Sequence, residues 1–132
     1  MDDPRAEAVQ KANQGFYDAF SGLDIIEMSR AWLQDGSVKC IHPGWALLTG
    51  WEDVMRSWER IFDNATMMQF AITDLEITVE GDWAWVTCTE NITFVDDARV
   101  AEGRVQATNM YKFHDSKWLM VHHHGSPVMQ GT

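Results

Sequence analysis

The sequence predicts an α+β fold in which helices cover one face of a curved, largely antiparallel sheet. Apolar residues recur at helical spacing in the first half of the chain, and four long runs rich in β-branched and aromatic residues follow from about residue 66. Helices followed by a strand meander are typical of the α+β class. At 132 residues the chain is expected to form one domain, residues 1–132.

The first two helices are indicated by their end signals. Asp3 and Pro4 suit the cap and first position of a helix that is expected to stop at Gly22. Asp24 and Glu27, three residues apart, have capping-box spacing and predict a second, shorter helix. The apolar stripes of the two helices are Val9, Ala12, Phe16, Phe20 and Leu23, and then Ile25, Met28 and Trp32.

A short strand and a third helix are expected next. The segment SVKCIHPGW, residues 37–45, suits a strand that Pro43 stops. Thr49 and Glu52 form another capping-box spacing, so the third helix is predicted over GWEDVMRSWERIF, residues 50–62. Its apolar positions fit a period of 3.6 residues.

The four later runs are predicted to be strands at residues 67–80, 83–95, 105–114 and 117–126. Gly81-Asp82 and Asp115-Ser116 are two-residue hairpin signals, and the first suits a type II′ turn. The loop signal between residues 95 and 105 is too weak to set the register of the two middle strands.

The first hairpin predicts which residues share a face, because cross-strand partners lie on the same side of a sheet. One face then carries Glu90 as its only charged residue among apolar neighbours. A carboxylate in such surroundings needs a partner or a proton. The apolar residues that share this face are Leu75, Ile77, Val79, Ala84, Val86, Cys88, Ile92 and Phe94.

The second hairpin predicts the orientation of the histidine triplet. A regular ladder pairs Asn109 with His122, and Ala107 with His124. His122 and His124 would then share a face with Asn109 and Tyr111, while His123 points the other way. Both faces of this strand are apolar, so one face is expected under the helices and the other at a subunit contact. A one-residue slip would exchange these assignments.

His42 is the remaining titratable candidate. It precedes Pro43 at a strand end, where it can act as an acid or base near neutrality, or can be a buried histidine bonded to a backbone carbonyl. His42, His122 and His124 could also form a three-histidine zinc site. Any strand with two histidines produces that pattern, so pocket histidines held by hydrogen bonds are favoured and no metal or cofactor is expected.

Composition excludes some partners. The net charge of −10 and the pI of about 4.7 argue against nucleic acid and anionic membranes, which need clustered Lys and Arg. The sequence shows no apolar run of membrane-spanning length and no apolar signal core at its beginning. Cys40 and Cys88 lie in apolar segments and are expected to be reduced, so a cytoplasmic location is expected.

The chain resembles the SnoaL-like branch of the nuclear transport factor 2-like superfamily. The similarity covers nearly the whole sequence and is most specific in the HPG turn, in the LLTGWEDVMRSWERIF helix and in the WLMVHHHGSP terminus. It implies a cone-shaped sheet wrapped by three N-terminal helices, the cystatin-like α+β barrel, with a pocket at the open end. It also implies homodimers or larger assemblies through the outer sheet face. The terminus also resembles the association domain of calcium/calmodulin-dependent kinase II.

The resemblance suggests residue roles but leaves the activity open. In ketosteroid isomerases the base is an Asp before Pro in the first strand, and the matching residue here is His42. The supporting tyrosine of the first helix falls near Tyr17. In the kinase association domain two arginines enter the pocket, and the resemblance places Glu90 and Asn109 at the corresponding positions here. Without the Asp and the arginines, neither isomerase chemistry nor a carboxylate ligand is established.

We therefore expect a homodimeric protein that binds a small apolar, polyketide-like or steroid-like molecule. If it is an enzyme, an isomerase-type or cyclase-type proton transfer is expected, with His42, Glu90 and Tyr17 as catalytic residues. The expected ligand-binding residues are Trp45, Trp58, Asn109, Tyr111, His122 and His124. The alternatives are a non-catalytic binding or assembly module and the three-histidine metal site.

Overall fold

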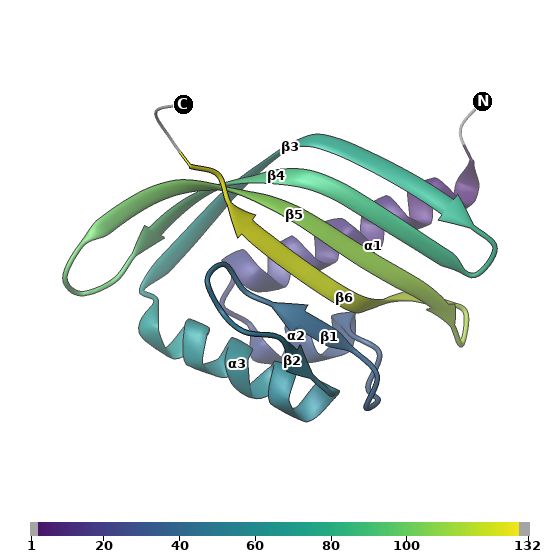
Figure 1. The fold of residues 1–132 in the computed structure, drawn as a ribbon, viewed down its shortest axis with the longest axis horizontal. Coiled ribbons are helices and arrows are strands. Elements are labelled where there is room, and N and C mark those ends of the chain that lie inside the picture. Colours follow the sequence, from purple (N-terminus) through teal and green to yellow (C-terminus); the bar gives the residue numbers. More distant parts are fainter. Residues whose placement is uncertain (1–2, 130–132) are drawn as a thin grey trace.

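The computed structural model describes residues 3–129 and contains three helices and six strands (Figure 1). The helices are α1 (Pro4–Ser21), α2 (Ile25–Ala31) and α3 (Trp51–Asn64). The strands are β1 (Lys39–Ile41), β2 (Leu48–Thr49), β3 (Met67–Glu80), β4 (Trp83–Val95), β5 (Val100–His114) and β6 (Lys117–Pro127).

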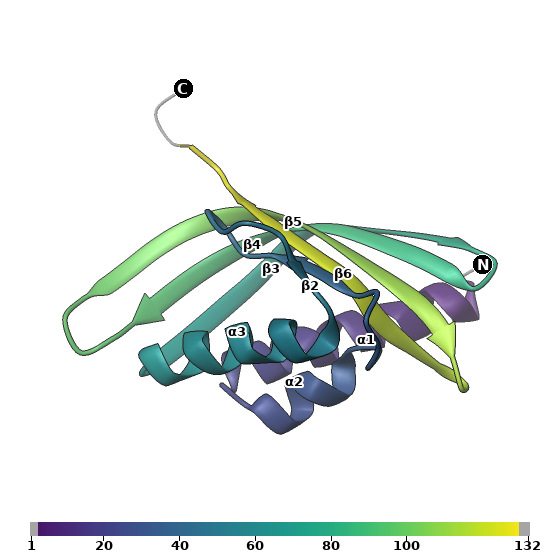
Figure 2. The same cartoon turned by 60° about the horizontal axis from the view of Figure 1, so that its bottom comes forward.

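The strands form one mixed sheet in the order β2-β1-β6-β5-β4-β3. The pairing of β1 with β6 is parallel, and the other neighbours are antiparallel. The sheet is strongly curved and open, and all three helices lie against one of its faces (Figure 2). The predicted α+β architecture is confirmed, with the sheet forming a cone wall rather than a closed barrel.

Two of the three predicted N-terminal helix caps are present in the structure. The Asp3 carboxylate accepts a hydrogen bond from the Arg5 amide at the start of α1, and Asp24 caps α2 in the same way through the amides of residues 26 and 27. The predicted Thr49 cap is wrong. Gly50, with φ of +95°, precedes α3 without a side-chain cap, because Thr49 pairs with Lys39 in the unpredicted strand β2.

The first hairpin has the predicted register, with Glu80 opposite Trp83 and Val79 opposite Ala84. Gly81 has φ of +59°, as the first position of a type II′ turn requires. The inner face of β4 is buried from Ala84 to Glu90 at alternate positions, and the helices cover it. Aromatic side chains from α1, α3 and β3 fill the space between the helices and the sheet: Phe16, Phe20, Trp58, Phe62 and Phe70.

The second hairpin departs from the prediction because β6 contains a bulge. Its first pairs are as expected, with Tyr111 opposite Met120. The next pair is Met110 with His122, which leaves Val121 as an extra residue in β6. From this point onward every side chain of β6 lies on the face opposite to the one predicted. Asn109 therefore pairs with His123, not with His122.

Strand β3 is an edge of the sheet, and it is also irregular. Its register with β4 shifts between Thr73 and Glu76, where Asp74 has φ of +56°. The Thr89 hydroxyl of β4 donates a hydrogen bond to the Asp74 carboxylate, at 3.0 Å. The shift bends the strand between its two straighter halves. Over residues 3–129, none of the helices has the length and apolar character needed to cross a membrane.

Candidate active site

Glu90 and Tyr17 form a buried pair inside the cone. Helix α1 places Tyr17 on its inner face, and the alternation of β4 places Glu90 opposite it. The tyrosine hydroxyl lies 2.5 Å from Glu90 Oε2 and 3.5 Å from the Cys88 sulfur. Burial raises the pKa of Glu90 to about 7, although the Tyr17 hydrogen bond acts in the opposite direction. The carboxyl group is thus poised to take or give a proton near neutral pH.

Asn109 connects this pair to the rest of the interior. Its amide nitrogen donates hydrogen bonds to the Tyr17 hydroxyl oxygen at 3.2 Å and to Asn13 Oδ1 at 2.9 Å. The Tyr111 hydroxyl donates to the same Asn13 oxygen at 2.7 Å. Both hydrogens of the Asn109 amide are therefore used, and its carbonyl oxygen is left to accept.

His123 supplies the hydrogen bond that Asn109 accepts. Its Nδ1 lies 2.6 Å from Asn109 Oδ1, so Nδ1 carries the proton. Burial lowers the pKa of His123 well below its usual value, and nearby His42 acts in the same direction. The imidazole is neutral, and it orients Asn109. Because an amide does not pass a proton onward, the Asn109–His123 side of the network fixes geometry and leaves proton exchange to the side that holds Tyr17 and Glu90.

His42 lies in a neighbouring cluster. Its Nε2 is 2.8 Å from the Ser57 hydroxyl, which itself donates to the Val54 carbonyl at 2.6 Å. Nε2 therefore carries a hydrogen and donates to Ser57. Burial lowers the pKa of His42 to about 4, so the ring is neutral at pH 7. Its expected backbone-carbonyl partner is replaced by a serine side chain on α3.

Aromatic rings pack around His42. Trp58 and Trp45 pack edge-on against it, with ring centroids at 4.6 and 4.8 Å. The Arg60 guanidinium lies over Trp45, 5.5 Å from the ring centre. The rings of His42 and His123 are 6.4 Å apart, which makes His123 the point where the two clusters meet.

The structure brings together only part of the predicted site. Tyr17, Glu90 and Asn109 are in direct contact, and Tyr111 joins them through Asn13. The predicted residues His42, Trp45 and Trp58 form the second cluster. His122 and His124 are not in the interior at all, because the bulge at Val121 turns them to the outer face.

Three participants were missed by sequence reasoning. Asn13 lies one helical turn before Tyr17, so its position on the inner face could have been read from the four-residue spacing. Ser57 directly precedes Trp58 in the apolar stripe of α3. His123 was assigned to the wrong face, and a β-bulge gives no sequence signal strong enough to have corrected it.

A groove of about 580 Å³ between α1 and β3 leads to Tyr17. This volume is within the range of small-molecule sites. The Tyr17 ring packs against Phe70 with centroids 5.6 Å apart, and Ile72 is the cross-strand partner of Glu90. The groove therefore reaches the Tyr17 side chain, which is 2% exposed and whose hydroxyl is bonded to Glu90. The groove is lined by Gln14, Tyr17, Asp18, Ser21, Met67, Met68, Gln69, Phe70 and Ile72.

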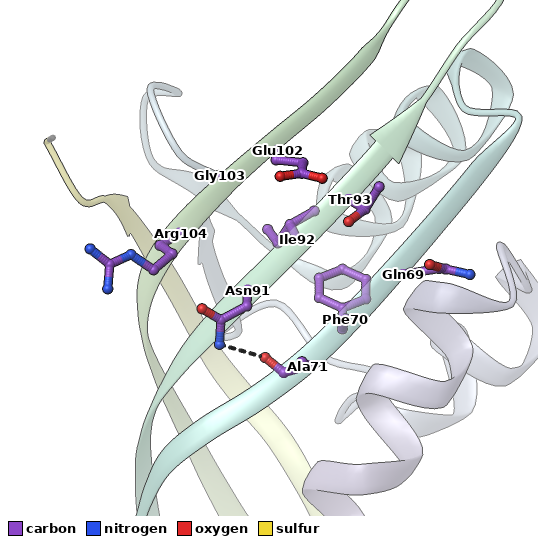
Figure 3. Close-up of a pocket in the computed structure, with 9 residues that line it drawn as sticks. All are labelled: Gln69, Phe70, Ala71, Asn91, Ile92, Thr93, Glu102, Gly103 and Arg104. Carbon is purple, nitrogen blue, oxygen red and sulfur yellow. Dashed lines mark hydrogen bonds between the residues drawn. The ribbon is translucent and has the colours of Figure 1, made fainter.

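A second groove of about 440 Å³ runs across β3, β4 and β5 farther out (Figure 3). The Asn91 amide donates a hydrogen bond to the Ala71 carbonyl there, at 2.8 Å, and the Arg104 side chain extends away from the others. None of the predicted site residues lines this groove. The Tyr17 groove is therefore the stronger candidate. Within residues 3–129, no three His, Cys, Asp or Glu side chains converge as a metal site.

The comparisons with known proteins agree with this fold. The sequence model of the SnoaL-like domain matches residues 9–130. The chain belongs to the SnoaL-like family. In plants, the F-box protein SKIP8 of Arabidopsis thaliana is 30% identical over 122 residues, which are 92% of this chain and 50% of that protein. The chain spans about half the length of this relative, so the activity of the whole protein does not carry over.

Two solved structures are similar over nearly their full lengths. A provisionally assigned dehydratase of the nuclear transport factor 2-like family from Streptomyces avermitilis is 37% identical, with a TM-score of 0.90 over 96% of this chain and 97% of that one. A provisionally assigned kinase type II association domain from Thiobacillus denitrificans is 28% identical, with a TM-score of 0.81 over 91% and 94%. This SnoaL-like chain therefore shares its fold with proteins assigned both enzymatic and assembly roles.

Proposed function

We propose that this SnoaL-like protein binds a small apolar molecule in the α1–β3 groove and transfers a proton to or from one of its oxygen atoms. The observation that carries the proposal is the Tyr17–Glu90 hydrogen bond of 2.5 Å at the end of that groove. The raised pKa of Glu90, about 7, supports it, because acid–base catalysis is most efficient when the group titrates near the working pH.

The pair can exist in two hydrogen-bonding directions. When Glu90 is ionised, the Tyr17 hydroxyl donates to it. When Glu90 is protonated, its own O–H can donate to the tyrosine oxygen, and the tyrosine hydrogen becomes free for a molecule in the groove. The Asn109 amide donates to the same tyrosine oxygen at 3.2 Å and holds the hydroxyl in place in both states. Protonation of Glu90 thus directs Tyr17 toward the ligand.

The chemistry that follows is proton donation to a carbonyl or hydroxyl oxygen. Tyr17 gives its hydrogen to the ligand oxygen and takes the hydrogen of Glu90, so the carboxyl group ends ionised and the tyrosine ends neutral. In a β-hydroxy ketone the protonated hydroxyl leaves as water, the Cα–H proton passes to solvent water in the groove, and the electrons of the C–H bond form the C=C bond. A protonated carbonyl makes the neighbouring C–H more acidic, so that the same proton loss gives an enol. These are steps of dehydration and of isomerisation. The likeness to the assigned dehydratase supports this reaction class.

The test uses the purified full chain and a panel of small apolar β-hydroxy ketones. We expect loss of water from one of them, followed by the ultraviolet absorbance of the enone product. Tyr17→Phe and Glu90→Gln should each abolish that absorbance change. Tyr111→Phe is the matched control, since its hydroxyl is equally buried but bonds Asn13 and not Glu90. Equal rates in the Glu90→Gln variant and the unaltered protein would refute the proposal.

A second candidate function, an assembly module, is favoured by the outer face of β4. Trp83 and Trp85 are 45% and 38% exposed there, on the face opposite to the buried Ala84 and Val86. Met110 lies opposite Trp85 on the same face. Exposed apolar residues gathered on one sheet face are typical of protein–protein contacts. We infer that this face joins two copies of the chain in a homodimer.

Sedimentation velocity tests the homodimer. Trp85→Glu should shift the protein to the monomer, because it places a charge in the contact. Leu47→Glu is the control, since Leu47 is also exposed but lies in the loop before β2. A dimer that persists in Trp85→Glu would exclude this face as the contact.

A further inference from the structure

His122 and His124 lie side by side on the outer face of β6, where they take no part in the buried network. They are two residues apart on one strand, so their side chains leave the sheet on the same side. Their ring centroids are 6.3 Å apart. We propose that this pair chelates a divalent transition-metal ion, with Zn²⁺ as the representative ion. The predicted inner face of these two histidines is wrong, because the bulge in β6 turns them to the outer face.

The geometry of the pair is close to that of a bidentate zinc ligand. Two imidazoles bound to one tetrahedral zinc ion at 2.0–2.1 Å bring their ring centres to about 5 Å from each other. The observed 6.3 Å therefore has to shrink by about 1 Å. His124 is exposed and His122 is half-buried, so rotation of the His124 side chain can close this gap without disturbing the core.

The β5 side of the pair places no charge against a bound cation, because Met110 lies opposite His122 and Thr108 lies opposite His124. Zinc binds the neutral form of imidazole, and the titration described below is therefore run at pH 7.5.

Lys39 is the charged neighbour that should limit affinity. It lies directly beside His122 in the parallel pairing of β1 with β6, and Ile41 lies beside His124. The lysine ammonium, which donates a hydrogen bond to the Ser37 carbonyl at 3.3 Å, should repel a bound cation. No third His, Cys, Asp or Glu joins the pair within residues 3–129, so water molecules would fill the other coordination positions.

Calorimetric titration of the full chain with zinc chloride at pH 7.5 tests the site. We expect one zinc ion per chain. His122→Ala and His124→Ala should each weaken binding by about tenfold or more, because each leaves a single imidazole. Lys39→Gln should tighten binding by removing the repulsion. His114→Ala is the matched control, since the side chain of this histidine at the β5–β6 hairpin is 49% exposed and lies apart from the pair, with its Nε2 at 3.3 Å from the Asp115 carboxylate.

The outcomes separate clearly. The proposal is supported if one zinc ion binds per chain and both alanine variants of the pair lose affinity while His114→Ala does not. It is overturned if His124→Ala binds zinc as tightly as the unaltered protein. It is also overturned if all three variants lose affinity equally, which would indicate adventitious binding to surface histidines. The proposal is independent of the Tyr17–Glu90 chemistry.

Discussion

Replacing Tyr17 by Phe should raise the pKa of Glu90. The change removes the hydroxyl that lies 2.5 Å from Glu90 Oε2, while the ring that packs against Phe16 and Phe70 remains. A hydrogen bond to a charged group contributes about 1.5–3 kcal/mol. At about 1.4 kcal/mol for each pKa unit, its loss corresponds to a rise of about 1 to 2. The pKa of Glu90 should therefore move from about 7 to about 8–9.

The assay is a pH titration of the Glu90 carboxyl carbon by NMR in ¹³C-labelled protein, with Glu90→Gln used to assign the signal. Tyr111→Phe serves as the control, because it removes a buried hydroxyl that does not touch Glu90. In that variant the pKa should stay where it is in the unaltered protein. An unchanged or lower pKa in Tyr17→Phe would show that the hydrogen bond does not stabilise the ionised carboxylate, and the proposed switch of direction would fail with it.

Three further predictions concern stability. Folding raises the pKa of Glu90 from 4.5 to about 7, so the stabilisation that its protonated form provides is fully present below pH 4.5 and is lost as the pH rises through about 7. The free energy of unfolding of Glu90→Gln, measured with urea, should therefore gain up to about 3 kcal/mol relative to the unaltered protein between pH 4.5 and pH 8. The same difference at both pH values would contradict this prediction. Burial lowers the pKa of His42 from 6.5 to about 4, so the stabilisation from its neutral form is fully present above pH 6.5 and is lost as the pH falls through about 4. In a plot of the free energy of unfolding against pH, His42→Asn should reduce the fall between pH 6.5 and pH 4. An unchanged fall would exclude His42 as its source. His123→Ala should cost about 2–5 kcal/mol and His124→Ala about 0.5 kcal/mol or less in thermal unfolding, since only His123 is buried, and the reverse order would favour the regular ladder over the bulge.

Much of the fold follows from local signals. The hairpin at Gly81-Asp82 fixed the faces of β3 and β4, because a two-residue turn leaves a single register. Glu90 was therefore predicted on the inner face, and it lies there. The capping aspartates located the first two helices for a similar reason, since each signal acts within a few residues.

The rest of the site depends on effects that a single sequence hardly encodes. The bulge at Val121 exchanges the faces of His122 and His123. Valine is common in regular strands, so its presence at position 121 does not indicate a bulge. The curvature of the sheet decides that Asn13 of the first helix meets Asn109 of β5. Such a contact between residues 96 positions apart can be seen only when the layers are assembled.

The irregularity of β3 protects this chain against aggregation through its edge strand. A regular edge strand of 14 residues would offer a continuous row of free backbone groups to a passing strand, the arrangement from which fibrils grow. The left-handed residue Asp74 divides that row into two shorter stretches that point in different directions. Straightening it, for example by Asp74→Val, should speed the appearance of thioflavin-positive aggregates at high concentration even if the folded protein is no less stable.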